Sequence, residues 1–406
     1  MAGKFKEKVI EKTVSEFKQI TDTIREPSNR NRIIAAAVIL VVMIGAAVYL
    51  NTPDQEEVET QASKMVFEKA KVTAVLSDDA QPDYNNAEGR RVGSQELEIK
   101  ILTGSHKDEI MTLTNYMSAL YNVDVEKGDR IIVRILTDED GLYYASMFNY
   151  NRGMVMGIFI LIFFVALIAL GGKKGLGAML GLLFTLLSIW YILIPCIMRG
   201  MPSILVTVLI ISITAAGSLI LLNGFSTKTL CAILGCVCGV VAAGVIAAVV
   251  GAISPMNGFN MSEAENLILY GADEGLKVSG LLVCGVLIAA LGAVMDVSLG
   301  IASSIWELHC RNPQLEAREL FHSGMHIGRD AMGTMANTLI LAFAGSSLNM
   351  LILVQSYGIP FIQLVNTDYI FMEVLQSVSG SMGILLSVPI VALISAQLMT
   401  RKKHIV

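Results

Sequence analysis

Long runs of apolar residues alternate with short polar segments along most of this 406-residue chain. A helix rises about 1.5 Å per residue and the hydrocarbon core of a bilayer is about 30 Å thick, so a spanning helix needs roughly 20 apolar residues. Eight segments meet this requirement, at about 33–50, 154–171, 175–198, 202–223, 229–253, 278–304, 331–355 and 376–399. The pattern predicts an α-helical polytopic membrane protein with about eight transmembrane helices.

The segment 51–152, between the first two apolar runs, follows a different pattern. Short alternating or β-branched runs are separated there by turn residues. These runs are 71–76, 95–102, 110–114, 130–136 and 143–148. They predict a small β-barrel-like domain between the first and second helices. No ladder of aromatic residues is apparent, so a structural or partner-docking role is favoured over binding of an oligosaccharide or peptide.

Lysine and arginine gather on one side of the predicted spans. The opposite side receives only Arg152, Arg199 and Lys277, near its membrane edges. Short loops rich in these residues stay in the cytoplasm, so a multi-pass protein of the cell membrane with both termini cytoplasmic is expected. The predicted organisation is a cytoplasmic segment 1–32, an anchor 33–50, an extracytoplasmic domain 51–152, a seven-helix transmembrane domain 153–400 and a cytoplasmic tail 401–406.

Composition narrows the class of protein further. Hydrophobic residues make up 54% of the chain and charged residues 16%, which is more apolar side chain than a soluble core of this size can hide. None of the six cysteines lies in 51–152, so disulfides do not stabilise that domain. The chain has no phosphate-binding loop, dinucleotide-binding glycine pattern, zinc-protease motif or nucleic-acid-binding basic patch. We therefore expect no enzyme activity, no catalytic residue, no cofactor, no metal and no nucleic-acid partner.

A carboxylate at membrane depth is the first candidate for chemistry. Asp296 lies in the sixth predicted span, about 12 Å from its cytoplasmic end by the helical rise. A charge at that depth costs about 3 kcal/mol or more, which marks a functional site by default. Asp296 shares a helical stripe with Ser303 and Glu307, together with two glycines. The acid is therefore expected to face the interior of the helix bundle.

The seventh predicted span opens with a second polar stripe. One face of this helix carries Asp330, Thr334, Asn337 and Thr338. Arg329, just before them, is an expected anchor at the membrane edge. Because the sixth helix descends and the seventh ascends, Asn337 is expected near the depth of Asp296. The two stripes predict either a proton or cation relay or a hydrogen-bonded interface that only holds the bundle together. Asp330 alone also suits the first turn of a helix, where an acid complements the dipole.

Small residues form a stripe in the fifth predicted span. Its members are Cys231, Gly235, Cys238, Gly239 and Ala242. Small side chains let two helix backbones approach closely, so the stripe predicts a packing face rather than a thiol site.

Two stretches of the chain closely resemble the YibE/F-like family of bacterial multi-spanning membrane proteins. They are 294–308, which contains Val-Met-Asp-Val-Ser-Leu-Gly, and 324–353, which contains Gly-Arg-Asp-Ala-Met-Gly-Thr-Met-Ala-Asn-Thr. The outer domain and the other spans also suit that family. The resemblance implies a permease-like membrane protein and supplies no catalytic residues.

The chain is more distantly similar to SecD/SecF proteins and resistance-nodulation-division transporters. In those proteins an acidic descending helix, a charged turn and an amphipathic stretch lead to a helix that opens with Arg followed by small and hydroxyl residues. Asp296, Glu307 and Arg329, followed by 334–338, keep that order. The chain departs from the pattern at 305–309, where the characteristic Asp-Arg-Ile-Arg-Glu run is replaced, and it has two spans too many.

Two functional classes follow from these observations. The first is a permease or proton- or ion-coupled transporter of an unknown small molecule or ion, with Asp296 as the coupling acid. The second is a non-transporting scaffold, or a SecD/SecF-like accessory, whose domain 51–152 docks envelope or secreted proteins. The lipid bilayer is the expected partner in both.

Overall fold

The computed structural model describes most of the chain after residue 64. The described residues are 45, 48–50, 65–83, 90–118, 121–137, 143–256, 267, 278 and 280–401. The predicted segment 1–32, most of the predicted anchor 33–50 and the predicted tail 401–406 apart from Arg401 lie outside them. The chain divides into two compact units, one of residues 52–166 and one of residues 1–51 with 167–406.

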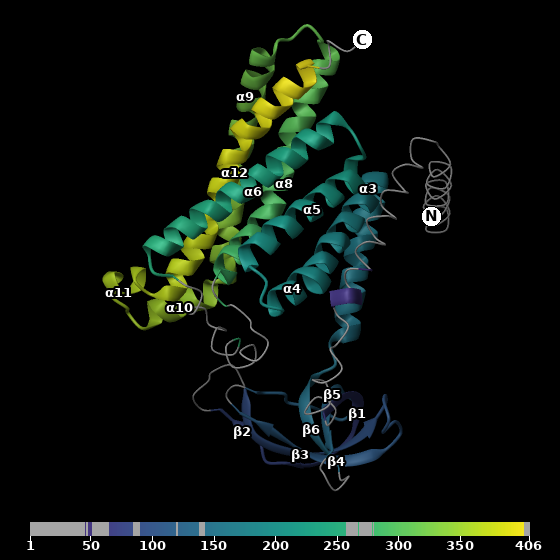
Figure 1. Cartoon of the computed structure of the whole chain (residues 1–406). Coiled ribbons are helices and arrows are strands. Elements are labelled where there is room, and N and C mark those ends of the chain that lie inside the picture. Colours follow the sequence, from purple (N-terminus) through teal and green to yellow (C-terminus); the bar gives the residue numbers. More distant parts are fainter. Residues whose placement is uncertain are drawn as a thin grey trace, which may run out of the picture. The chain divides into compact units, whose positions relative to one another are not determined.

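The first unit contains a curled antiparallel sheet (Figure 1). Its strands are β1 (Met65–Asp78), β2 (Gln81–Pro82), β3 (Arg91–Ile101), β4 (Ile110–Met117), β5 (Arg130–Thr137) and β6 (Tyr143–Tyr150). The order is β2-β3-β1-β5-β6, and β4 also pairs with β3. The sheet curls far enough for β4 to contact β6. All five predicted runs lie in strands, apart from Leu102 just after β3, and the β-rich character of this segment is confirmed.

Alternation of side chains builds the core of this unit. Leu97, Ile99 and Ile101 on β3 are fully buried, as are Ile131 and Val133 on β5, while residues between them face outward or are only partly covered. Successive side chains of a strand point to opposite faces, so one face of the curled sheet encloses an apolar interior.

A polar network ties the segment before β5 to the sheet. Arg91 pairs with Asp78 and, at 3.1 Å, with Asp124. The buried Gln95 donates a hydrogen bond to Asp124 at 3.1 Å and accepts one from the Val125 N–H at 3.3 Å. The hydrogen bond from Arg91 is the main reason why the pKa of Asp78 is lowered to about 2.

Asp78→Asn is expected to make the stability of this unit less dependent on pH below about pH 4. The depressed pKa means that the ion pair contributes fully above about pH 4, the pKa of an unfolded aspartate, and that this contribution is lost as the pH falls towards about 2. The excised segment 58–150 should give a strand-type circular dichroism spectrum, and its urea midpoint should fall less steeply below pH 4 in Asp78→Asn than in the unmodified segment. Asp79→Asn is the control, and an unchanged slope in Asp78→Asn would contradict the assignment.

The second unit is helical. Helix α3 (Gly153–Ser188) begins in the first unit and belongs to the second from residue 167 onward. The other elements of the second unit are a π-helical turn η2 (Ile189–Leu193), α4 (Ile194–Met198), α5 (Ser203–Asn223), α6 (Thr227–Ile253), α8 (Leu281–Arg311), α9 (Ala317–Ser346), α10 (Leu348–Ser356), α11 (Phe361–Val365) and α12 (Asp368–Arg401). They pack as long helices around α6, α8 and α12 (Figure 1).

The part of the chain that the structure describes contains fewer candidate membrane spans than the eight that the sequence predicts. Among the described residues, five helices are long and apolar enough to cross a membrane, or six if α9 and α10, which meet at 60°, form one bent span. The long helix Gly153–Met198 counts once, although Gly172 interrupts it with a positive φ of 54° between the predicted spans 154–171 and 175–198. The predicted total of eight is not confirmed.

Glycines let α6 and α12 cross at short distance. A Cβ on Gly239 would lie 2.7 Å from Ser387 Cβ and 3.1 Å from the Gly383 carbonyl oxygen, and one on Gly383 would lie 2.9 Å from the Gly239 carbonyl oxygen. The predicted packing stripe is confirmed for Cys231, Gly235 and Gly239, which are buried. It is wrong for Cys238, which is exposed, and Ala242 is only half-buried.

Candidate functional site

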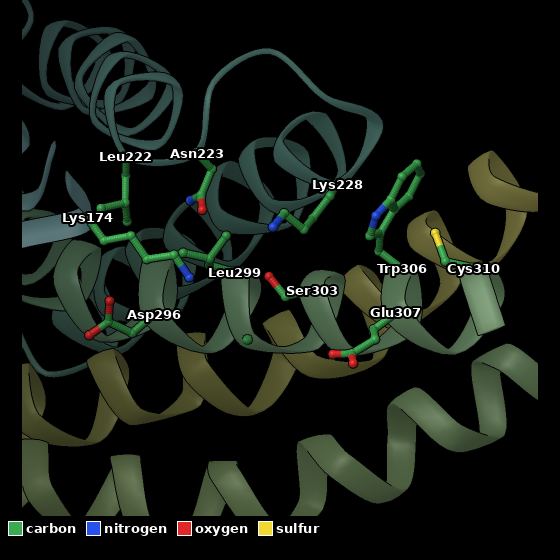
Figure 2. Close-up of a pocket in the computed structure, with 11 residues that line it drawn as sticks. Lys174, Leu222, Asn223, Lys228, Asp296, Leu299, Ser303, Trp306, Glu307 and Cys310 are labelled. Carbon is green, nitrogen blue, oxygen red and sulfur yellow. The ribbon is translucent and has the colours of Figure 1, made fainter. Parts of the chain in front are cut away.

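A cavity of about 740 Å³ lies in the helical unit between α3, the turn from α5 to α6, and α8. This volume is within the usual range for small-molecule sites. Its lining residues are Lys174, Leu222, Asn223, Lys228, Asp296, Leu299, Gly300, Ser303, Trp306, Glu307 and Cys310 (Figure 2). Figure 2 places Lys174 and Asp296 towards one end of the cavity and Trp306 and Cys310 towards the other.

Helix α8 forms the longest wall of the cavity. Its buried face, which includes Val294, Ile301 and Ile305, packs into the core of the bundle. Asp296 and Glu307 lie on the opposite, open face of the same helix. A Cβ built on Gly300 or Gly292 would meet no atom within 4 Å, so this part of α8 carries no packed neighbour in the described structure.

Close packing of α3 on α5 brings Lys174 to the cavity. A Cβ on Gly177 would lie 3.1 Å from the Leu221 carbonyl oxygen, and the hydroxyl of Ser218 donates a hydrogen bond of 3.0 Å to the Gly181 carbonyl. The backbones of the two helices are therefore in near contact. Lys174 lies one turn before Gly177 on α3, which sets its side chain beside the end of α5.

The turn from α5 to α6 supplies the third wall. Asn223 is the last residue of α5, and Gly224 after it has a φ of 72°, a conformation that glycine adopts without strain. Ser226 caps α6 by accepting a hydrogen bond of 3.1 Å from the Thr229 N–H. Lys228 therefore stands in the first turn of α6, where the helix dipole adds partial positive charge.

Several polar groups of the cavity have no partner among the residues that the structure describes. In the part of the chain that the structure describes, Lys174, Lys228 and Asp296 form no hydrogen bond or ion pair. The amide nitrogen of Asn223 is enclosed and also lacks a partner there. Glu307 is different, because Arg311 one turn later pairs with it at 2.7 Å. The cavity is thus lined by polar groups whose hydrogen-bonding capacity the described protein groups do not use.

The structure does not bring the stripe on α9 to Asp296. A Cβ on Gly324 would lie 2.6 Å from Ile305, and one on Gly328 would lie 3.1 Å from Ile301, so the glycine face of α9 packs on α8. The predicted residues lie on the other face of α9 and are exposed: Arg329, Asp330, Thr334, Asn337 and Thr338. None of them lines the cavity.

The hydroxyl groups of the α9 stripe bond within their own helix. Thr334 donates to the Ala331 carbonyl at 2.9 Å, and Thr338 donates to the Thr334 carbonyl at 2.8 Å. Of the predicted site residues, Asp296, Ser303 and Glu307 are the ones gathered in the cavity. Asn337 is exposed on α9 and does not line the cavity, so its predicted proximity to Asp296 is not confirmed. The helical rise predicts depth in the membrane but does not fix which face of α9 packs inward.

Four residues that line the cavity were not predicted as site residues from the sequence. The charge pattern places Lys174 and Lys228 only on the predicted cytoplasmic side, and no sequence motif assigns a role to Asn223 or Trp306. One signal was present, because both lysines interrupt apolar runs beside glycine or cap residues at helix ends.

Comparison with known protein families agrees with this architecture. Residues 159–401 match the family described as YibE/F-like protein, and residues 67–149 match the YibE/F family N-terminal domain. The chain belongs to the YibE/F-like family. The second match coincides with the curled sheet, and the first covers nearly all of the helical unit of this YibE/F-like chain.

No curated protein and no solved structure matches the YibE/F-like chain significantly. The family and the apolar helices indicate a membrane protein. Among the described residues, no group of three or more His, Cys, Asp or Glu side chains is placed to hold a metal ion.

Proposed function

We propose that this YibE/F-like membrane protein is a permease that couples the movement of a small solute to a proton or another cation, with Asp296 as the coupling carboxylate. One observation carries the proposal. Asp296 stands without an ion-pair or hydrogen-bond partner, among the described residues, in a cavity that three helical elements line with ionisable groups. Carboxylates inside apolar helices are costly, and they are characteristic of ion and proton pathways.

The arrangement suggests how a gradient is used. Ionised Asp296 has no bonded partner among the described residues, and uptake of a proton or cation neutralises this charge between apolar helices. When the surrounding helices move and water enters, the ion is released again. A two-state bundle whose states hold the ion with different affinity converts the gradient into directed movement.

Flux into proteoliposomes tests the proposal directly. The full chain is reconstituted with a pH-sensitive dye inside, a potassium diffusion potential is imposed with valinomycin, and a small-molecule extract of cells is supplied outside. Proton entry should exceed that of protein-free liposomes, and it should depend on the extract. Entry at the protein-free rate under all conditions would contradict a proton-coupled permease, and repeating the assay with a sodium-sensitive dye tests the other common cation.

The proposal includes an orientation, with both termini in the cytoplasm of a cell-membrane protein and 51–152 outside. It rests on the one-sided distribution of lysine and arginine. In a background without the native cysteines, Lys127→Cys in the turn before β5 should react with an impermeant maleimide added to intact cells. Restored Cys310, which is exposed in the structure, should react only after lysis. Labelling of Cys310 in intact cells would refute this orientation.

A scaffold that docks envelope or secreted proteins is the second candidate, and a surface of the curled sheet favours it. Phe67 and Phe148 form an edge-to-face pair with ring centroids 4.9 Å apart, and both rings are about half exposed. Exposed apolar surface of this kind often marks a protein contact. If docking is the function, Phe148→Ser should reproduce the phenotype of a deletion strain and Asp296→Asn should not.

A further inference from the structure

The charges that line the cavity do not balance. Lys174 and Lys228 bring two positive charges without partners among the described residues, whereas the charge of Glu307 is matched by Arg311. Only Asp296 remains to oppose the lysines, and it becomes neutral when it carries the proton that the proposed function assigns to it. The cavity then holds an excess of two positive charges.

Several of the groups that line the cavity are hydrogen-bond donors, which also favours a negatively charged ligand. The ammonium groups of Lys174 and Lys228 and the indole N–H of Trp306 can only donate, and the amide of Asn223 offers a donor without a partner. The hydroxyl of Ser303 adds a further donor. The first turn of α6, which carries Lys228, contributes partial positive charge as well. A ligand that accepts many hydrogen bonds and carries negative charge fits these groups best.

We propose that the cavity binds a phosphate-type oxyanion, as a free phosphate or phosphomonoester or as the headgroup of an anionic phospholipid. Lys174 and Lys228 supply the charge, and Asn223 supplies a directed hydrogen bond. This inference deepens the permease proposed above, because it names the chemical class of the solute that shares the cavity with Asp296.

Apolar side chains leave room for the rest of such a ligand. Leu222, Leu299 and Trp306 line the same cavity beside the charged groups. A volume of about 740 Å³ exceeds what phosphate alone occupies, so an organic group attached to the phosphate fits against them.

The charge of Asp296 couples binding of the anion to binding of the proton. Ionised Asp296 repels an anion that enters its cavity, and protonated Asp296 does not. Each ligand therefore raises the affinity for the other, as linkage requires. Asp296→Asn therefore distinguishes the oxyanion site from the proton-coupled permease. The variant should bind the anion at least as tightly as the unmodified protein, while losing proton flux.

Trp306 makes the site directly observable. The chain contains two tryptophans, and Trp190 in the π-helical turn does not line the cavity. A Trp190→Phe variant of the full chain leaves Trp306 as the sole tryptophan reporter. Its emission is recorded in detergent during titration with sodium phosphate and with glycerol phosphate, at ionic strength held constant with sodium chloride.

The expected result is a saturable change in Trp306 emission. Loss of one charge-assisted contact in Lys174→Gln or Lys228→Gln should raise the dissociation constant about tenfold or more. Lys173→Gln is the matched control, because Lys173 neighbours Lys174 but does not line the cavity, and it should leave the constant unchanged. Lys174→Arg and Lys228→Arg keep the charge and should retain binding, even if the glutamine variants fail to fold.

A second arm separates the two sources of the phosphate group. The Trp190→Phe variant is placed in nanodiscs of phosphatidylcholine with or without phosphatidylglycerol. A response to phosphatidylglycerol that the lysine variants lose, with none to soluble phosphate, assigns the site to a lipid headgroup. The absence of any response to soluble or lipid phosphate, or an equal response in Lys173→Gln and both lysine-to-glutamine variants, overturns the proposal. Anion binding without proton flux would instead uphold the site and refute the permease.

Discussion

Asp296→Asn is expected to reduce gradient-driven proton entry to the rate of protein-free liposomes while the protein still folds. Asparagine keeps the shape and polarity of the side chain but cannot carry a proton. Folding should be little affected, since Asp296 lies on the open face of α8 and its carboxylate has no partner among the described residues. The measurements are dye-reported flux in proteoliposomes and the elution profile of the purified protein in detergent.

Asp330→Asn is the matched control for this prediction. Asp330 is exposed on the outward face of α9 and lies outside the cavity, so the flux should be retained. Loss of flux in both variants would show that the stripe on α9 takes part in a relay after all. If Asp296→Asn only lowers the folded yield, or leaves gradient-dependent flux unchanged, the carboxylate is not the coupling group.

Gly239→Leu is expected to destabilise the helical unit severely. Any side chain at this position meets Ser387 Cβ at 2.7 Å and the Gly383 carbonyl oxygen at 3.1 Å, and a backbone carbonyl cannot rotate aside as a flexible side chain does. Overpacking of a core costs about 1–3 kcal/mol where side chains can adjust, and separation of two helices should cost more. The midpoint of thermal aggregation in detergent should therefore fall sharply, with loss of folded yield.

Gly292→Leu provides the comparison. A Cβ at Gly292 meets no atom within 4 Å, although the residue also stands in the interior of a long apolar helix. This variant should behave like the unmodified protein in the same assay. Equal damage from both substitutions would mean that glycine acts through helix propensity or lipid contact, and that the crossing of α6 and α12 is not the cause.

Periodicity predicted the class of fold because each kind of element has its own repeat. The strands of the first unit and the apolar helices of the second follow directly from repeats of two residues and from long uninterrupted apolar runs. The bend between α9 and α10 near Ser347 interrupts the run 331–355 without a proline. Its sequence signal is Gly345-Ser346-Ser347, a Gly/Ser cluster that a count of uninterrupted apolar residues does not register.

The candidate site was harder to predict than the fold, because a site depends on which helix faces meet. Gly324 and Gly328 decide the orientation of α9, and they precede the polar stripe that drew the prediction. Lys174 shows the complementary error, since a lysine at the end of an apolar run has the same pattern whether it anchors a helix at the membrane surface or lines a cavity. Charge counts along the chain do not separate these cases.

The open glycines on α8 have a consequence for how this family diversifies. The face of α8 that holds the fold together, at Ile301 and Ile305, is separate from the face that lines the cavity, where Gly300 has free space around it. Substitutions at Gly300 can reshape the chamber without disturbing the packed side of the helix. If the chamber binds a solute as proposed above, substitution at Gly300 offers a way to change which solute it accepts while the scaffold stays unchanged.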